Sequence, residues 1–396
     1  MFRWDLDKTY LKTEFDTVSD LLRIARLTAE ERENIPGSAA LLRAIKASTP
    51  QPDAHGVYFI SGSPNLIRAV IEKKFNLDGF TPDGFTLKPT LSDVFRGRFR
   101  AVRAQVGYKL AHLIEGRSHI PIGTPETLFG DDAENDAFIY SLYADIVEGK
   151  VDEDTVLEVL EAAGAYPDQI DDVRHSLGAL VHEPAIDRII IHLDQKTPIE
   201  AFAPFLPRVI PIRNHLQTAI ILVLDGTLPA EVVRVVAQEL LDRYGFSSER
   251  LIRVGRRILE ERRVHAHALT AEQLAHELRA IDPSKPPPGA FDAGPTGGSV
   301  EATHEVLQGL AEVAENLPRV TTVELPAPPS ARNYLELWDA EVARVEEHRR
   351  RRKKALESAA KAGSPAEPAA NTEYARAVAD IGDEEPAFAE PEPEHG

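Results

Sequence analysis

In the segment Val57-Tyr58-Phe59-Ile60-Ser61-Gly62-Ser63-Pro64, four hydrophobic residues are followed at once by a turn-forming tetrapeptide. A short apolar run that ends at a turn predicts a buried β-strand. Behind the turn, residues 66–75 carry apolar side chains at helical spacing, which predicts an amphipathic helix. A strand followed by such a helix is typical of a parallel sheet with crossover helices.

The same alternation extends through the first half of the chain. Apolar runs at residues 1–4, 126–129 and 188–193 predict further strands, and residues 208–212 fit one more. Residues 98–115 and 137–147 have the spacing of helices. We therefore expect an α/β fold with a Rossmann-like core around a parallel sheet.

Composition divides the chain into five parts. We expect the core at 1–213, with a helical insertion near 151–182, and then a helical region at 214–281. Half of residues 282–299 are Gly or Pro, which predicts a linker before a helical extension at 300–360. Residues 361–396 are acidic and rich in Ala and Pro, and they have too little apolar surface to offset the entropy of ordering, so we expect a disordered C-terminal tail.

Charge and composition exclude several classes of protein. The 396 residues include 45 basic and 64 acidic side chains, and the resulting charge of −19 argues against a nucleic-acid partner. The absence of cysteine excludes disulfides, thiol nucleophiles and thiolate metal sites. No apolar run is long enough for a membrane helix and no signal-peptide pattern is present, so we expect a cytoplasmic protein without integral membrane association.

Two aspartates follow the first apolar run. A loop that leaves the strand at Asp5 could bring the carboxylates of Asp5 and Asp7 to one ligand. Asp5 would then be a nucleophile or metal ligand, and Asp7 a general acid–base. Because Asp-x-Asp is a common pattern, a solvated turn remains the alternative.

Polar groups also follow two other predicted strands. The hydroxyl of Ser61 and the N–H of Gly62 could bind phosphate oxygens, although an ordinary turn has the same sequence. The segment Gly130-Asp131-Asp132-Ala133-Glu134-Asn135-Asp136 gathers hard oxygen ligands that suit Mg²⁺. A calcium EF-hand loop does not fit, because Ala137 stands where that loop requires glycine. Lys109 lies on a predicted helix, where a solvated lysine is the alternative.

The carboxylates and the hydroxyl lie at the carboxyl ends of predicted strands, where open α/β sheets build their sites. The order of these residues resembles the four-motif signature of the haloacid dehalogenase (HAD) superfamily. The four motifs here are Asp5-x-Asp7-x-Thr9, Ser61, Lys109 and Gly130-Asp131-x-x-x-x-Asp136. Within it, residues 59–64 and 130–140 are similar to the phosphatidate phosphatase catalytic domain family. The resemblance covers roughly residues 1–150 and implies a HAD core.

The resemblance implies a role for each position. Asp5 would attack phosphorus and form an aspartyl-phosphate, and Asp7 would protonate the leaving oxygen and then activate water. Lys109 would neutralise developing negative charge. The implied Mg²⁺ ligands are Asp5, Asp7 through its backbone carbonyl, Asp131 and Asp136, where Asp136 supports Asp131. The implied substrate-binding residues are Thr9, which steadies the loop, Ser61 and Gly62.

These expectations combine into a Mg²⁺-dependent phosphatase that hydrolyses a phosphomonoester through Asp5. The separations from Asp5 to Ser61 and from Ser61 to Lys109 leave no room for a large cap, so the substrate could be a lipid, a protein or another large phosphate ester. The short first strand, which contains Arg3, motivates an alternative: a HAD-like scaffold with weak or no catalysis that acts in binding or regulation. A phosphotransferase is a third hypothesis.

Other conspicuous residues have structural explanations. A second segment is similar to the first motif: Leu222-Val223-Leu224-Asp225-Gly226-Thr227-Leu228. Val223 stands at the position of the nucleophilic aspartate, so this segment lacks the attacking carboxylate. We therefore expect Asp225 in a helix or turn. We expect Trp4 and Trp338 to be packing residues and His265-x-His267 to be a surface pair. The basic run at 349–354 fits a solvated helix end.

Overall fold

The computed structural model describes residues 1–13, 27–48, 56–88, 101–261, 269–285, 300–317 and 332–361. Residues Met1–Val345 form one compact unit, and Glu346–Gly396 form a second. The His265-x-His267 pair, most of the predicted linker and the predicted disordered tail after Lys361 lie outside the described residues.

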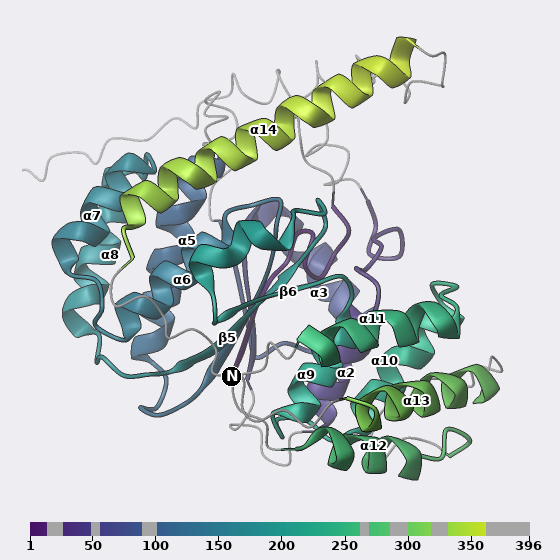
Figure 1. Cartoon of the computed structure of the whole chain (residues 1–396). Coiled ribbons are helices and arrows are strands. Elements are labelled where there is room, and N and C mark those ends of the chain that lie inside the picture. Colours follow the sequence, from purple (N-terminus) through teal and green to yellow (C-terminus); the bar gives the residue numbers. More distant parts are fainter. Residues whose placement is uncertain are drawn as a thin grey trace, which may run out of the picture. The chain divides into compact units, whose positions relative to one another are not determined.

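The first unit contains a six-stranded parallel sheet, which confirms the predicted α/β class with a Rossmann-like arrangement (Figure 1). The strands lie in the order β3-β2-β1-β4-β5-β6. Their bounds are β1 Phe2–Asp5, β2 Val57–Pro64, β3 Gly84–Lys88, β4 Glu126–Asp131, β5 Ile186–His192 and β6 Val209–Ile212. The chain proceeds outward from β1 in one direction and from β4 in the other, so the strand order reverses between these two strands. Such a reversal opens a crevice at the carboxyl ends of the strands.

Helices connect the strands and cover both faces of the sheet. On one side lie α2 Ser38–Ala47, α3 Arg68–Leu77, α9 His215–Leu224, α10 Glu231–Asp242, α11 Ser248–Glu261, α12 Ala271–Ala280 and α13 Val300–Glu315. On the other lie α5 Ala101–Ser118, α6 Asp136–Val147, α7 Glu153–Ala162, α8 Pro167–Ala179 and the start of α14 Tyr334–Lys361. Two short 3₁₀ helices, η1 Asn65–Ile67 and η2 Ile199–Phe205, complete the described helices.

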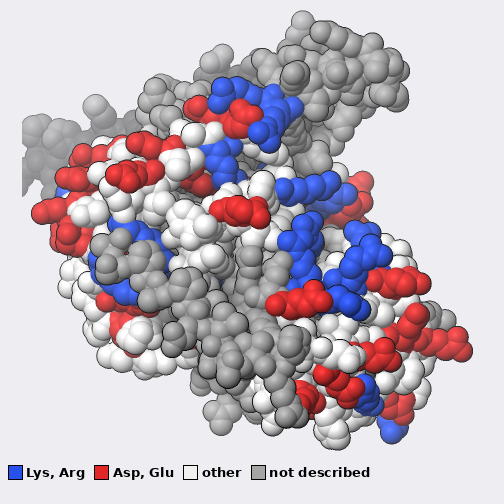
Figure 2. All heavy atoms as spheres, viewed as in Figure 1, with Lys and Arg blue, Asp and Glu red and all other residues white. Residues whose placement is uncertain are grey.

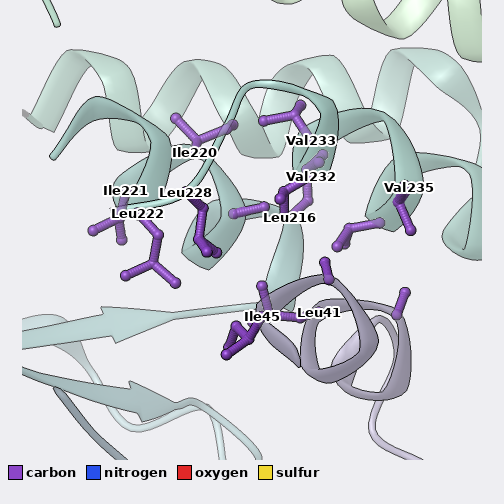
Figure 3. Packing of buried hydrophobic residues seen from close by; sticks show 14 of the residues in the cluster. Leu41, Ile45, Leu216, Ile220, Ile221, Leu222, Leu228, Val232, Val233 and Val235 are labelled. Atoms are coloured by element: carbon purple, nitrogen blue, oxygen red, sulfur yellow. The ribbon is translucent and has the colours of Figure 1, made fainter. Parts of the chain in front are cut away.

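The first face of the sheet is buried under α2, α3 and α9. Because side chains alternate along a strand, Phe2 and Trp4 of β1 point to this face together with Phe59 of β2. Apolar side chains of α2, α9 and α10 point toward one another behind it (Figure 3). The predicted helical region therefore packs on the sheet and continues its hydrophobic core outward.

Helix α13 belongs to this same group of helices, although its sequence lies beyond the predicted linker. Gly255 of α11 and Gly309 of α13 let the two helices approach closely. A Cβ atom on Gly255 would lie 2.3 Å from a methyl carbon of Leu310, and one on Gly309 would lie 2.4 Å from a methyl carbon of Ile252. Asp225 directly follows the last residue of α9, in agreement with the expected place in a helix or turn.

The second face of the sheet is covered by α5 and α6, with α7 and α8 outside them (Figure 1). The exposed side of α7 is acidic, and acidic side chains gather over this part of the surface (Figure 2). Tyr334 and Trp338 of α14 are buried against Phe138 of α6. Trp4 and Trp338 are thus both packing residues, as expected.

Arg3 lies on the second face and is almost completely buried. Its Nε atom lies 2.6 Å from Glu126 on the neighbouring strand β4, and Arg117 lies 2.7 Å from the same carboxylate. Tyr143 donates a further hydrogen bond to Glu126. A buried charge is tolerated when an opposite charge pairs with it, so the ion pair with Glu126 accommodates an arginine in the centre of the sheet.

In the described part of the chain, no helix combines the length and the apolar character that crossing a membrane requires.

Candidate metal centre and active site

The first part of the site is the carboxyl end of β1. Asp5 is the last residue of this strand, and the chain then forms a tight turn in which the N–H of Leu11 donates to the carbonyl of Leu6 at 2.9 Å. Lys8 has a φ of 60° in this turn, a left-handed conformation that few non-glycine residues adopt. Asp5 and Asp7 are both buried.

The second part is the loop between β4 and α6. One oxygen of Asp131 accepts hydrogen bonds from the backbone N–H groups of Ala133, at 2.6 Å, and Glu134, at 3.0 Å. Asp136 is the first residue of α6 and accepts a hydrogen bond from the N–H of Asp131. Gly130 is required here, because a Cβ atom would lie 2.4 Å from an oxygen and 2.5 Å from the Cβ of Asp136.

These two parts bring four carboxylates together. Asp5, Asp131, Glu134 and Asp136 each offer one oxygen, and these oxygens all lie within 4.8 Å of one another. One side-chain oxygen of Asp5 and one of Asp131 are buried without a hydrogen-bond partner among the described residues. Because an unpaired buried carboxylate oxygen is costly, a cation is the natural partner for both atoms. The cluster could therefore hold a metal ion.

Lys109 extends from α5 into the same cluster and is completely buried. Its ammonium nitrogen lies 2.9 Å from Asp5, 3.1 Å from Glu134 and 2.5 Å from Asp136. One lysine thus contacts three of the four carboxylates. Because these acidic groups crowd around one ammonium group, a divalent ion would stabilise their ionised forms.

Burial and mutual repulsion shift the acidities in the cluster. Burial raises the pKa of Asp5 well above its ordinary value, although Lys109 opposes the shift. Burial likewise raises the pKa of Asp131, and Glu134 adds to this effect. Burial by itself would lower the pKa of Lys109, but Asp136 and Asp5 outweigh it, so the lysine keeps its proton. Perturbed acidities of this kind are concentrated at functional sites.

Asp7 lies beside this cluster and outside the group of four. Its carboxylate accepts hydrogen bonds from the hydroxyls of Ser61, at 2.9 Å, and Ser63, at 2.7 Å. The Ser61 oxygen also accepts a hydrogen bond from the N–H of Ser63 at 3.0 Å. Burial raises the pKa of Asp7, and the two serine hydroxyls partly oppose the shift. The predicted residues at the ends of β1 and β2 are therefore in direct contact.

Two other predicted residues lie at the edges of this arrangement. The backbone carbonyl of Thr9 lies 3.3 Å from Nε2 of His215 at the start of α9, which ties the β1 turn to the helical layer. Gly62 faces the side chain of Gln105 on α5, and a Cβ atom there would lie 3.1 Å from the Gln105 amide nitrogen. The amide of Gln105 in turn donates to Glu134 at 3.3 Å.

Sequence reasoning did not assign roles to Glu134, Ser63 and Gln105. Glu134 lies within the quoted acidic segment, but its ion pair with Lys109 joins two separate elements and cannot be seen in the sequence. Ser63 lies near the end of β2, where the sequence predicted a turn, and only the position of β2 beside the β1 turn shows that Ser63 binds Asp7. Gln105 precedes Lys109 by one helical turn, so its place on the same face of α5 is a signal that could have found it.

No protein-family model, curated protein or solved structure matches this chain. The chemistry of the site is therefore inferred from its own geometry.

Proposed function

We propose that this protein is a Mg²⁺-dependent phosphohydrolase of the HAD type that hydrolyses a phosphomonoester through Asp5. The observation that carries the proposal is the meeting of Asp5, Asp131 and Asp136 with the Lys109 ammonium group at the reversal point between β1 and β4. A carboxylate nucleophile, further carboxylate ligands and a lysine at one position suit the transfer of a phosphoryl group.

The residues present fit a magnesium ion. Asp5 and Asp131 each have a buried oxygen without a hydrogen bond among the described residues, and Mg²⁺ commonly binds through one or two carboxylates. Asp136 and Glu134 would support it, and the backbone carbonyl of Asp7 would complete the protein ligands. A bound Mg²⁺ would polarise the phosphoryl oxygens and reduce their repulsion with the Asp5 carboxylate.

In the proposed reaction, a carboxylate oxygen of Asp5 attacks phosphorus, and the bond between phosphorus and the ester oxygen breaks. The leaving oxygen takes a proton from Asp7, whose raised pKa favours a protonated carboxyl group. Asp7 then accepts a proton from water, and this water attacks the aspartyl-phosphate to release phosphate and restore Asp5. Ser63 holds the Asp7 carboxyl throughout, whereas the Ser61 hydroxyl, which donates to Asp7 before the substrate binds, would turn to a phosphoryl oxygen.

Lys109 and the end of β2 would bind the transferred group. The Lys109 ammonium already lies within ion-pair distance of Asp5, so it can stabilise negative charge on the phosphoryl oxygens that Asp5 attacks. The N–H of Gly62 and the hydroxyl of Ser61 are proposed to hold phosphoryl oxygens. Since the sequence leaves no room for a large cap, the proposed substrate is a lipid, a protein or another large phosphate ester.

The direct test is hydrolysis of a chromogenic phosphate ester with and without Mg²⁺. We expect Mg²⁺-dependent turnover by the wild-type protein and only background hydrolysis by Asp5→Asn, because an amide is a far weaker nucleophile than a carboxylate. The Asn side chain is nearly isosteric, so it serves as a matched control for folding. Equal rates from the two proteins would contradict the proposal.

Trapping of a phosphoryl mimic separates catalysis from the alternative of a regulatory scaffold. An active site of the proposed kind binds beryllofluoride at Asp5 only when Mg²⁺ is present, and Asp5→Asn should not bind it. The scaffold hypothesis depended on Arg3 in the first strand, and the ion pair with Glu126 accounts for that residue structurally. A wild-type protein that fails to bind the mimic would favour the scaffold.

A further inference from the structure

The start of α14 contacts the loop that carries the acidic ligands. The guanidinium of Arg344 donates to the backbone carbonyl of Asp132 at 2.7 Å and to that of Glu134 at 3.0 Å. Both carbonyls lie between Asp131 and Asp136, the ends of the ligand loop. A residue more than 200 positions away in the sequence therefore holds the backbone of this loop.

The Arg344 side chain is itself held in place. Glu341, one helical turn earlier on α14, accepts hydrogen bonds from Nε at 2.9 Å and from a terminal nitrogen at 2.6 Å. Such paired hydrogen bonds between a guanidinium and a carboxylate fix the orientation of the guanidinium and are stronger than a single hydrogen bond. Arg344 thus reaches the loop carbonyls in a fixed orientation.

Helix α14 is anchored to α6, which follows the ligand loop directly. The hydroxyl oxygen of Tyr334 lies within hydrogen-bonding distance of the carbonyl of Ser141, at 2.8 Å, and of the Asp145 carboxylate, at 2.7 Å. Arg332 pairs with Asp145 at 2.7 Å, and the Trp338 indole donates to the carbonyl of Ala162 at 3.2 Å. The start of α14 therefore binds both the loop and the helix into which the loop runs.

The opposite side of the loop is also fixed. The Asp132 carboxylate accepts hydrogen bonds from the backbone N–H groups of Gln195, at 2.7 Å, and Thr197, at 2.8 Å. The loop is consequently held between the segment after β5 and α14, and Asp131 and Glu134 point from it into the carboxylate cluster.

We propose that Arg344 is a positioning residue for the metal site, and that the start of α14 is an integral part of that site. By binding the carbonyls of Asp132 and Glu134, Arg344 stabilises the turn in which Asp131 accepts backbone hydrogen bonds and Glu134 reaches Lys109. Without Arg344, the loop would have to become ordered when the ion binds, and the cost of ordering it would reduce the affinity for the ion. The inference rests on the metal site of the proposed function and does not require that the protein hydrolyse phosphate esters.

The test is Mg²⁺ affinity, measured by titration calorimetry on the full chain without substrate. Loss of groups that orient metal ligands commonly weakens binding by about 10- to 100-fold, and we expect this for Arg344→Ala. Arg344→Lys should recover part of the affinity, because an ammonium group can still donate to a carbonyl oxygen. It lacks the planar guanidinium geometry that lets Arg344 bind both carbonyls and Glu341 at once. Arg351→Ala, which removes an exposed arginine from the same helix, should bind like the wild type.

Trp338→Phe separates positioning from the general docking of α14. This change removes the hydrogen bond to Ala162 and should lower the melting temperature without changing Mg²⁺ affinity. Wild-type affinity in a folded Arg344→Ala protein, or an equal loss of affinity in Trp338→Phe, would overturn the inference. A wild-type protein that binds Mg²⁺ without hydrolysing esters would contradict only the proposed function, whereas one that binds no divalent ion would overturn both.

Discussion

Lys109 shows at the scale of a single residue how the site balances its charges. It is completely buried, and its ammonium nitrogen contacts Asp5, Glu134 and Asp136, which come from two different segments. These carboxylates depend on Lys109 when no cation is bound, because each would otherwise repel the others in a poorly solvated space.

We expect Lys109→Met to lower the free energy of unfolding of the metal-free protein by about 3–5 kcal/mol, the cost typical of breaking a buried ion pair. Mg²⁺ should recover more stability in the variant than in the wild type, because the ion would replace the missing positive charge. Urea unfolding with and without Mg²⁺ measures both effects. Unchanged stability of the metal-free variant would show that the carboxylates do not need the lysine.

At the scale of elements, close packing between helices determines which part of the chain completes the core. Helices α11 and α13 meet at Gly255 and Gly309, where added methyl groups would collide with Leu310 and Ile252. Since protein interiors are packed densely, such contacts tolerate little added volume. The glycines therefore account for the packing of α13 against α11.

We expect Gly255→Ala to destabilise the protein by about 1–3 kcal/mol, because the new methyl group overlaps Leu310 in a filled core. Gly178→Ala is the matched control: Gly178 lies in α8, and a Cβ atom there would meet no atom within 4 Å. The control should leave stability unchanged or raise it by up to about 1 kcal/mol, because alanine is the better helix former. Thermal or urea unfolding distinguishes the two, and a neutral Gly255→Ala would refute the packing argument.

At the scale of the whole first unit, His215 joins the beginning of the chain to the helical layer. It is buried at the start of α9, 5.4 Å from the Trp4 ring between centroids, and its Nε2 lies near the Thr9 carbonyl. Burial, with a contribution from His192, lowers the pKa of His215 to about 3. The folded protein therefore keeps this histidine neutral.

This shift predicts a loss of stability in acid. Between the ordinary histidine pKa of about 6.5 and a folded value of about 3, the unfolded chain binds a proton that the folded chain does not, so stability falls as pH falls. At pH 5 the loss from His215 is on the order of 2 kcal/mol relative to pH 8. His215→Gln should remove this part of the slope in unfolding measured from pH 8 to pH 4. Identical slopes for the two proteins would exclude His215 as the source.

Much of the fold followed from local sequence. The apolar runs before Ser61 and Gly130 predicted strands β2 and β4, because a short apolar run is a property of neighbouring residues. The turn predicted at residues 61–64 was wrong, because β2 continues to Pro64 and pairs with β3 there. Strand β3 at Gly84–Lys88 was not predicted, because this half-exposed edge strand lacks a continuous apolar run. Asp5, Asp131, Asp136 and Lys109 could be selected from the sequence because they stand at predicted strand ends or in motif order.

The sequence by itself determined the α/β class, the positions of most strands and the acidic residues near their ends, since each of these depends on short-range patterns. Tertiary structure alone decided that Ser63 binds Asp7, that Glu134 binds Lys109 and that Arg344 holds the ligand loop. The physical reason is that these contacts join separate segments of the chain, and the number of residues between two segments does not determine how close they lie in the folded protein. They form only when the sheet order and the packed helices bring the segments together.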